Sequence, residues 1–237
     1  LGAEPVLAVA TSAMRDAANA PQFRDSLHER YGIELQTISG DEEARLTFLG
    51  ATAARPAGGS PTLVIDIGGG STEFTVGTPG SAPEFAVSTR AGSVRQTERH
   101  LRDDPPTHSQ TEALAAEIRS ILAAEVPERV RTRVSHGIAV AGTATSLAAI
   151  SQELDPYDAA RVHGYRLERA EAERITALLA TLPLSDREEV PGLHPKRAPT
   201  IVAGAVILVE SMRAFELQNV DVSEADILHG TVLDVAS

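Results

Sequence analysis

The chain has 237 residues, no cysteine and a formal net charge of −12. The lack of cysteine excludes disulfide bonds, thiolate metal sites and thiol catalysis. The acidic balance argues against a generic nucleic-acid surface, and an aromatic content of 3% without tryptophan argues against stacking platforms for bases. No apolar run approaches the roughly 20 residues of a membrane-spanning helix, so we expect a cytoplasmic protein that binds neither membrane nor nucleic acid.

The beginning of the chain alternates predicted strands with predicted helices. A stretch rich in Pro, Gly and Ser at 55–61 is the best candidate for a domain boundary. We therefore expect residues 1–57 to be the C-terminal part of a first domain and residues 58–237 to form a second domain, and we leave open that the last helix packs back on the first. The elements predicted before the boundary are strands over 6–10 and 35–38 and helices over 21–31 and 41–49.

The stretch from Thr62 to Gly77 predicts two strands joined by a very short turn. Apolar runs on both sides of three glycines favour strands, which must then be antiparallel neighbours. Successive glycines permit positive φ and let backbone N–H groups face a bound oxyanion, and Ser71 adds a hydroxyl donor. Asp66 and Glu73 flank the glycines and suit a hydrated Mg²⁺ held between carboxylate and phosphate. The alternative is an ordinary hairpin with a mobile glycine loop.

A second anion site is predicted where the small residues 142–146 follow a strand over 137–141 and precede a helix that begins at Leu147. The N-terminus of a helix after such a turn presents free N–H groups to an anion. The last helix is expected to begin after Ser223 as N-cap, with Asp226 at N3. The other expected elements are strands over 84–89, 163–167 and 219–222, a turn over 90–95, helices over 109–125, 170–182 and 197–217, and a charged connector over 184–196.

Six stretches of the chain, in order, closely resemble the exopolyphosphatase and guanosine-pentaphosphate phosphohydrolase family, Ppx/GppA. One motif such as DIGGGST would indicate only the wider superfamily of actin, hexokinase and the heat-shock ATPases, whereas six in register indicate the family. The resemblance extends over essentially the whole chain and is to the shorter, two-domain members common in actinobacteria. The stretches are AVATSAMRDAANAPQF, ISGDEEARLTFLG, LVIDIGGGSTEF, VAGTATSLAA, KRAPTIVAGAVIL and VSEADILHG.

The resemblance implies an α/β fold of two ribonuclease-H-like domains, each a mixed sheet with flanking helices, that face each other across a cleft for phosphate chains. It also implies hydrolysis of a terminal phosphate with a divalent metal, Mg²⁺ or Mn²⁺. Family members begin with a strand and loop of the DxGSNS/T type, which nothing here matches, so we expect an N-terminal part beyond the given sequence. Without that part, independent activity is in question.

The family motifs assign roles to individual residues of this chain. Glu43, the second acid of the SGxEEAR motif, corresponds to the catalytic glutamate, and a helix-capping acid is the alternative reading. The neighbouring Glu42 is turned from it by about 100° on a helix, so only one of the two should face the cleft. The resemblance gives Asp66 and Glu73 roles in metal and water positioning. The phosphate loops would be Gly68, Gly69, Gly70 and Ser71, and Gly142, Thr143 and Thr145.

Basic residues that could contact phosphate are few, because Lys196 is the only lysine. Arg15 and Arg197 lie in motif-like stretches and are favoured, since a guanidinium group matches phosphate oxygens in a bidentate way. A solvated surface role is the alternative for each cation, and a structural role is the alternative for His194 and His229 as ligands. The remaining basic candidates are Arg45, Arg90, Arg95 and Lys196 itself.

Our leading hypothesis from the sequence is a metal-dependent exopolyphosphatase that acts on inorganic polyphosphate. Guanosine pentaphosphate is the rival substrate, and scarce aromatic residues favour polyphosphate over a stacked guanine. A kinase-like phosphotransferase of the same superfamily and a non-catalytic binder of polyphosphate or alarmone are further alternatives. We leave a homodimer open.

Overall fold

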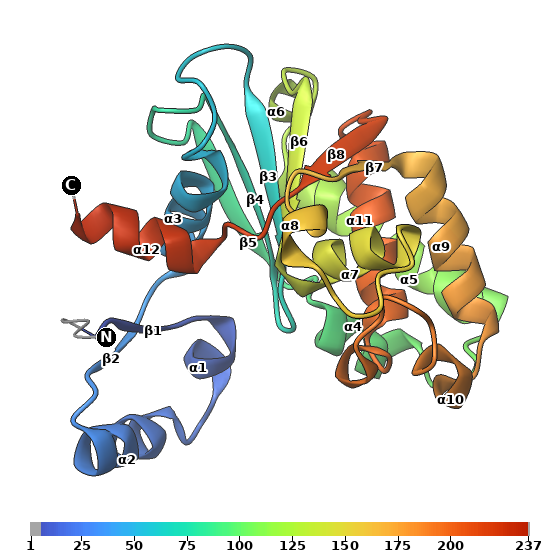
Figure 1. The fold of residues 1–237 in the computed structure, drawn as a ribbon, viewed down its shortest axis with the longest axis horizontal. Helices are drawn as coiled ribbons and strands as arrows, with labels where there is room; N and C mark the ends of the chain where they lie inside the picture. Colours follow the sequence, from blue (N-terminus) through green and yellow to red (C-terminus); the bar gives the residue numbers. More distant parts are fainter. Residues whose placement is uncertain (1–5, 237) are drawn as a thin grey trace.

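The centre of the molecule is a six-stranded mixed sheet with the strand order β5-β4-β3-β6-β8-β7 (Figure 1). The computed structural model describes residues 6–236. Strands β3, β6 and β8 run parallel, whereas the pairs β3–β4, β4–β5 and β7–β8 are antiparallel. The strands are β3 (Thr62–Ile67), β4 (Thr72–Gly77), β5 (Phe85–Thr89), β6 (His136–Val140), β7 (Arg166–Glu168) and β8 (Asn219–Val222). This mixed sheet confirms the α/β class and the predicted antiparallel hairpin.

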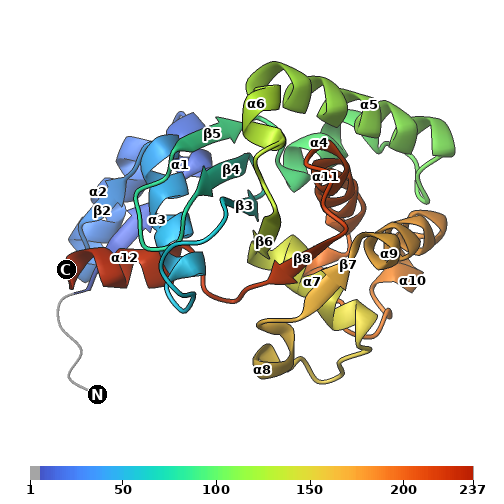
Figure 2. The same ribbon diagram turned by 90° about the horizontal axis from the view of Figure 1, so that it is seen from above.

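Helices cover both faces of the sheet (Figure 2). Leu63 and Ile65 of β3 belong to the main core with residues of α5, α7, α9 and α11, whereas Val64 between them packs with Phe48 and Ala51 of α3 on the other face. This alternation follows from the period of two along a strand. The helices that follow β5 in the chain, up to β8, are α4 (Ser93–His100), α5 (His108–Glu125), α6 (Glu128–Arg131), α7 (Ala141–Ser151), α8 (Ala159–Val162), α9 (Arg169–Thr181), α10 (Leu184–Arg187), the 3₁₀ turn η1 (Pro195–Arg197) and α11 (Ile201–Ala214).

The N-terminal part of the chain forms a separate small sheet in which β1 (Ala8–Ala10) pairs in parallel with β2 (Leu35–Thr37). Along the chain, β1 is followed by α1 (Ser12–Asp16) and α2 (Ala20–Tyr31), whereas α3 (Gly40–Thr52), which follows β2, packs on the main sheet. The last helix, α12 (Ile227–Val235), crosses α3 closely. A Cβ on Gly50 would lie 2.1 Å from the Asp226 carbonyl oxygen, and one on Gly230 would lie 1.8 Å from that of Leu46. Glycine at both positions therefore lets the two helices touch through their backbones.

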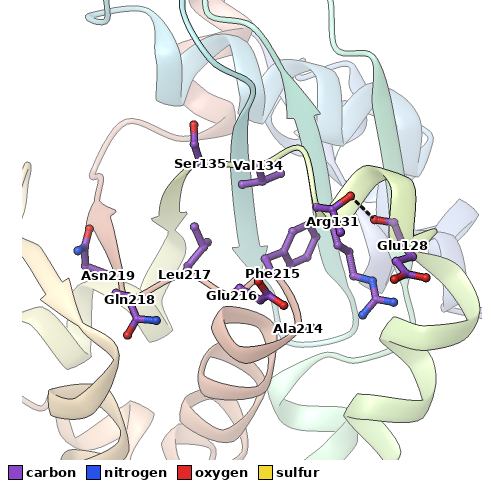
Figure 3. Close-up of a pocket in the computed structure, with 11 residues that line it drawn as sticks. Glu128, Arg131, Val134, Ser135, Ala214, Phe215, Glu216, Leu217, Gln218 and Asn219 are labelled. Atoms are coloured by element: carbon purple, nitrogen blue, oxygen red, sulfur yellow. Dashed lines mark hydrogen bonds between the residues drawn. The ribbon is translucent and has the colours of Figure 1, made fainter.

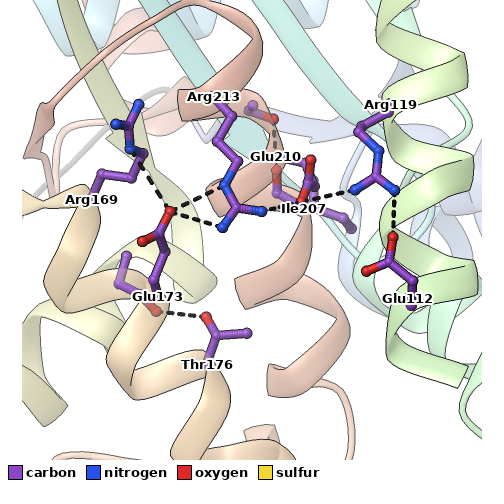
Figure 4. A network of polar contacts seen from close by, with 10 residues as sticks. Glu112, Arg119, Arg169, Glu173, Thr176, Ile207, Glu210 and Arg213 are labelled. Carbon is purple, nitrogen blue, oxygen red and sulfur yellow. Dashed lines mark hydrogen bonds and ion pairs between the residues drawn. The ribbon is translucent and has the colours of Figure 1, made fainter. Parts of the chain in front are cut away.

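A network of ion pairs ties the buried helix α11 to α5 and α9 (Figure 4). Its centre is Glu210 of α11, which is 3% exposed, accepts from Arg213 Nη1 at 2.7 Å and lies 3.4 Å from Arg119 Nη1 of α5. Arg213 also donates to Glu173 of α9 at 2.9 Å. Among the described residues, no helix is both long and apolar enough to cross a membrane.

Several predicted boundaries are wrong, and each error has a local cause. The stretch 90–95 is not only a turn, because α4 begins at Ser93. This helix has only eight residues, nearly all of them polar, so its sequence gives little apolar pattern from which to predict it. The helix expected from Leu147 begins six residues earlier, at Ala141. The small residues before Leu147 are typical of a loop and therefore hide the start of the helix. Helix α12 has Asp226 as its N-cap, accepting from Leu228 N–H at 2.9 Å, instead of Ser223. Residues 1–5 and 237 of the expected domains lie outside the described residues.

Candidate functional site

The predicted site residues gather at one edge of the main sheet, where three neighbouring parallel strands end. β3 leads into the glycine loop, β6 leads into α7, and β8 leads into the segment 223–226 before α12. The register pairs Asp66 with Val140 and Ala139 with Val222, so the three strands end at the same level. Ligand sites of α/β sheets commonly lie at this carboxyl edge.

The β3–β4 register sets Asp66 directly opposite Glu73. Both side chains lie on the face that α3 covers, where Thr75 Oγ1 donates to the Ala44 carbonyl oxygen. Asp66 is 9% exposed and Glu73 is 1% exposed. Like charges opposite each other on neighbouring strands are destabilising, and burial adds to the cost. A chain selected for stability alone would not favour this pair.

The environment raises the pKa of Asp66 to about 7. Burial is the main cause, and repulsion from the carboxylates of Glu73 and Glu43 adds to it. A hydrogen bond from Thr47 Oγ1, at 3.3 Å, acts in the opposite direction by stabilising the charged form. Asp226, at the start of α12, contributes further repulsion. Four acids from α3, β3, β4 and α12 therefore act on one another at this edge.

Glu73 is influenced in the same way. Burial is the main cause that raises its pKa, followed by repulsion from Glu43. Hydrogen bonds from the hydroxyls of Ser88, at 2.6 Å, and Ser71 lower it, as does the positive charge of Arg15. Ser71, which we predicted to bind phosphate, thus directs its hydroxyl to Glu73.

Glu43 and Glu42 face different surroundings, as expected for neighbours on a helix. Glu43 is 7% exposed, and its Oε2 accepts from Arg15 Nη1 at 2.9 Å. The same Arg15 nitrogen donates to the Ile38 carbonyl oxygen at 2.9 Å. Glu42 instead forms a two-fold contact with Arg45 on the helix surface, at 2.9 and 2.8 Å. The structure therefore places Arg15 on the candidate catalytic carboxylate, and the guanidinium group holds that carboxylate in place.

The donor set fits a hard divalent cation that uses few protein ligands. Within residues 6–236, no three acids or histidines are arranged to hold a metal ion by themselves. Mg²⁺ commonly binds through one or two carboxylates and completes its shell with waters and phosphate oxygens. Asp66 and Glu73 are buried, and burial and neighbouring carboxylates raise the pKa values of both. A bound cation would compensate the negative charge of these two residues.

The glycine loop is built differently from the prediction. None of Gly68, Gly69 and Gly70 has a positive φ. Two of the loop carbonyls instead accept from the start of α4, with Ser93 N–H to Gly68 O at 2.9 Å and Val94 N–H to Gly69 O at 3.0 Å. Among the described residues, the N–H groups of Gly69 and Gly70 find no acceptor. Glycine serves here for close packing, and two free N–H donors remain for an anion.

Arg95 joins the glycine loop to α1. Its Nε donates to the Gly70 carbonyl oxygen at 2.9 Å and its Nη2 to Asp16 at 2.7 Å. A Cβ on Gly70 would lie 2.8 Å from Ser12 Oγ, so the loop and α1 are in close contact. Arg90, with its side chain 75% exposed, lies 3.9 Å from the same Asp16.

The second predicted loop is the first turn of α7. Ala141 has a φ of 63°, a strained value for a residue with a Cβ, and such strain is concentrated at functional sites. A Cβ on Gly142 would lie 1.8 Å from the Arg197 Cζ, so the guanidinium group occupies the space that glycine leaves. Thr143 is buried and packs on Gly204 of α11, so its side chain points away from the turn's open side. Arg197 and the free N–H groups of the helix start give one positive site.

A cavity of about 720 Å³ adjoins this turn. Thr145 and Arg197 both line it, together with Tyr157 and Glu224. The Tyr157 hydroxyl donates to Glu224, and burial, followed by that carboxylate, raises the pKa of Tyr157 to about 12. The Arg197 guanidinium lines this cavity beside Tyr157, and its positive charge acts on the Tyr157 hydroxyl; among residues 6–236 it forms no ion pair with a carboxylate, so it can contact a ligand here.

Other basic candidates are engaged elsewhere. Arg45 bonds to Asp234 of α12 at 2.8 Å, which fixes α12 to α3. His194 accepts from Lys196 N–H at 3.2 Å and so caps the turn η1. His229 is exposed and lies 3.9 Å from Asp226. None of the three is brought to the glycine loop.

Sequence reasoning missed four residues that the structure brings to the site region. Thr47 and Ser88 hydrogen-bond to the buried acids, Asp226 adds a carboxylate, and Tyr157 lines the cavity beside Arg197. Helical spacing could have placed Thr47 one turn after Glu43 on the same face. The other three depend on contacts between distant segments.

A different cavity, of about 420 Å³, lies at the opposite end of the parallel strands (Figure 3). It is lined by Ser135, which directly precedes β6, and by Asn219, the first residue of β8, together with Arg131 and Phe215. It contains none of the predicted site residues, and we assign it no function.

The chain is similar to known proteins over nearly its whole length. The family model described as the Ppx/GppA phosphatase family matches residues 1–237. The chain belongs to the Ppx/GppA phosphatase family. Exopolyphosphatase 2 of Mycobacterium tuberculosis is 34% identical over 99% of this chain and 76% of its own length.

Solved structures of the Ppx/GppA family share the fold. The crystal structure of an exopolyphosphatase-like protein superposes with a TM-score of 0.91 at 32% identity, over 99% of this chain and 78% of the other. The Aquifex aeolicus Ppx/GppA family member superposes with a TM-score of 0.86 at 28% identity, over 98% and 74%. The resemblance seen in the sequence, including the actin-like fold, is therefore confirmed.

Replacing Asp66 with Asn should stabilise the metal-free protein in a pH-dependent way. The folded-state pKa of Asp66 is raised to about 7, so its neutral form stabilises the fold at low pH and that contribution is lost as the pH rises towards 7. In urea unfolding with a chelator present, Asp66→Asn and the wild type should have similar free energies of unfolding near pH 4. Near pH 8 the free energy of unfolding of the variant should be higher by up to a few kcal/mol, since one pKa unit corresponds to about 1.4 kcal/mol. Mg²⁺ should reduce this difference in the free energy of unfolding by stabilising the wild type. A difference that does not change with pH would contradict the raised pKa of Asp66.

Gly142→Ala should act through Arg197. A Cβ at position 142 would occupy the place of the guanidinium group, so the arginine must move away from the start of α7. We expect both Gly142→Ala and Arg197→Ala to weaken tripolyphosphate binding about tenfold, and the double variant to lose no more than either single one, because coupled residues are not additive. Isothermal titration measures the affinities, with Arg174→Ala on the exposed face of α9 as the control. Additive losses would show that the two residues act separately.

Proposed function

We propose that the protein is an exopolyphosphatase that hydrolyses the terminal phosphate of inorganic polyphosphate. The observation that carries the proposal is the buried Glu43, held by Arg15 beside the Asp66–Glu73 pair at the end of β3. A base for a phosphoanhydride must be positioned next to groups that can compensate the charge of the transferred phosphoryl group. This edge of the sheet offers both.

In the proposed reaction, Glu43 orients a water molecule in line with the terminal phosphorus and accepts its proton. A bond forms between the water oxygen and phosphorus as the bridging bond to the next phosphate breaks, and the shortened chain leaves with the electron pair of that bond. A divalent cation, when bound near Asp66 and Glu73, would supply positive charge to the phosphate oxygens. The N–H groups of Gly69 and Gly70 and the Arg197 guanidinium would hold further phosphates.

A relative's name supports the choice of substrate. Exopolyphosphatase 2 of M. tuberculosis covers 99% of this chain at 34% identity. Polyphosphate needs only repeated anion sites, and free N–H donors at the glycine loop and the start of α7 provide two. On its composition, we propose that the stretch 55–61 is a hinge between the part of the chain that carries Arg15 and Glu43 and the part that carries both anion sites.

Guanosine pentaphosphate is the second candidate, and the cavity beside Arg197 favours it. The cavity, of about 720 Å³, has apolar walls from Leu154, Val190 and Leu193 and the ring of Tyr157, which could take a nucleoside. A polyphosphate chain would gain nothing from such walls. The choice between the two substrates therefore depends on a direct comparison.

The test is phosphate release from long-chain polyphosphate and from guanosine pentaphosphate, each with Mg²⁺ and with excess chelator. We expect release from polyphosphate that depends on Mg²⁺, because the acids of the site need a compensating cation. Faster release from guanosine pentaphosphate would select the second candidate. Inertness towards both substrates, in a protein that includes any N-terminal part, would reject the proposed function.

A further inference from the structure

The residue that brings positive charge to α7, Arg197, lies in an exposed turn between two buried anchors. Leu193 before the turn is 5% exposed and Ala198 after it is 0% exposed. Further back, a Cβ on Gly192 would lie 2.5 Å from the Ala149 backbone, so the connector is packed directly against α7. The position of the Arg197 side chain thus depends on how firmly the Ala198 end of this turn is held.

That end of the turn contacts a buried arginine. Arg187, the last residue of α10, is 5% exposed. Its Nη2 donates to Asp104 Oδ1 at 2.5 Å, and its Nη1 makes a longer contact, 3.4 Å, with the Ala198 carbonyl oxygen. Asp104 Oδ2 accepts from Leu184 N–H at 2.8 Å, so both of its oxygens are used. Among residues 6–236, Arg187 Nε has no acceptor.

Fold stability gives little reason for this arrangement. Only the arginine of the pair is buried, because 48% of the Asp104 side chain is exposed. Burial of the guanidinium costs desolvation, and an apolar residue of similar size often serves as well or better. Arg187 also leaves one buried N–H group without an acceptor, which adds to the cost. The pair links the loop before α5 to the residue that directly follows Arg197, two segments more than eighty positions apart in the chain.

We propose that the Arg187–Asp104 pair is a positioning device that fixes the backbone at Ala198 and thereby keeps the Arg197 guanidinium over Gly142. Among the described residues no carboxylate pairs with the Arg197 guanidinium over Gly142, so its place there depends on the backbone of the turn, which Arg187 contacts at Ala198. Arg187 and Asp104 act through Arg197 and do not touch the substrate. The inference rests on the proposed function only in taking phosphate as the ligand of Arg197.

The test uses the absence of cysteine from the chain. A nitroxide label on Lys196→Cys reports the mobility of the turn in the full protein. We expect Asp104→Asn, which keeps an acceptor but removes the charge, to increase label mobility. The control Glu112→Gln, at an exposed carboxylate that pairs with Arg119, should leave it unchanged. Unchanged mobility in Asp104→Asn would overturn the proposal, whatever happens to activity.

A ligand titration tests the same coupling without relying on turnover. Asp104→Asn should weaken the binding of tripolyphosphate with Mg²⁺ about tenfold in the wild-type background and by less than about twofold when Arg197 is already Ala, because the effect passes through Arg197. Equal losses in both backgrounds would show a merely structural role and overturn the proposal.

An apolar replacement separates positioning from folding. Arg187→Met combined with Asp104→Leu removes the buried guanidinium together with its half-exposed partner, so the protein should fold at least as well as Asp104→Asn, which leaves the buried charge without its ion pair. We expect it to melt like the wild type and still show a mobile turn with weak tripolyphosphate binding; wild-type binding would overturn the proposal. If the wild type itself releases no phosphate from polyphosphate, the proposed function fails, while the label still decides the positioning role.

Discussion

The site depends on one unfavourable arrangement, the pairing of Asp66 with Glu73 across the β3–β4 hairpin. The antiparallel register and the period of two along each strand force both carboxylates onto the buried face under α3. Their pKa values are raised by burial and by repulsion from neighbouring acids, which include Glu43. Because a fold tolerates such strain where function requires it, the pair explains why hydroxyl groups, a guanidinium group and, we propose, a cation collect around it.

Several elements of the structure surround this pair, and some of them compensate its negative charge. Arg15 neutralises Glu43 within the N-terminal part of the chain, and the hydroxyl of Ser88 bonds to Glu73 within the main sheet. The backbone contact of α3 with α12 at Gly50 and Gly230 brings the start of α12, with its acid, to the same edge. The positive charge that could attract a phosphate is that of Arg197, at the start of α7, which follows β6, the strand next to β3. The site is thus assembled from four segments that no single motif contains.

The sequence predicted much of this arrangement and failed where the cause is not local. Strong strand patterns on both sides of three glycines predicted the hairpin over Thr62–Gly77, with Asp66 and Glu73 beside its turn. The direct pairing of the two acids comes from the observed register. The role of the glycines was wrong in detail, because they provide space for α4 and α1 and not positive φ. The start of α7 is not predicted, because small residues resemble a loop. The sequence predicts a capping role for Asp226, and the structure shows it as the N-cap of α12 instead of N3. Its effect on Asp66 is not predicted, because that approach depends on the helix crossing. Contacts between distant segments leave no periodic signal in the chain.

In the proposed mechanism, Glu43 performs the chemistry while the hairpin and α7 hold the phosphates. The most direct measurement compares tripolyphosphate affinity and the turnover of polyphosphate in Glu43→Gln, with Glu42→Gln, whose carboxylate pairs with Arg45, as the matched control. The account predicts that Glu43→Gln binds at least as well as the wild type and turns over about 10²- to 10⁴-fold more slowly, while Glu42→Gln behaves like the wild type. Wild-type turnover by Glu43→Gln would contradict it.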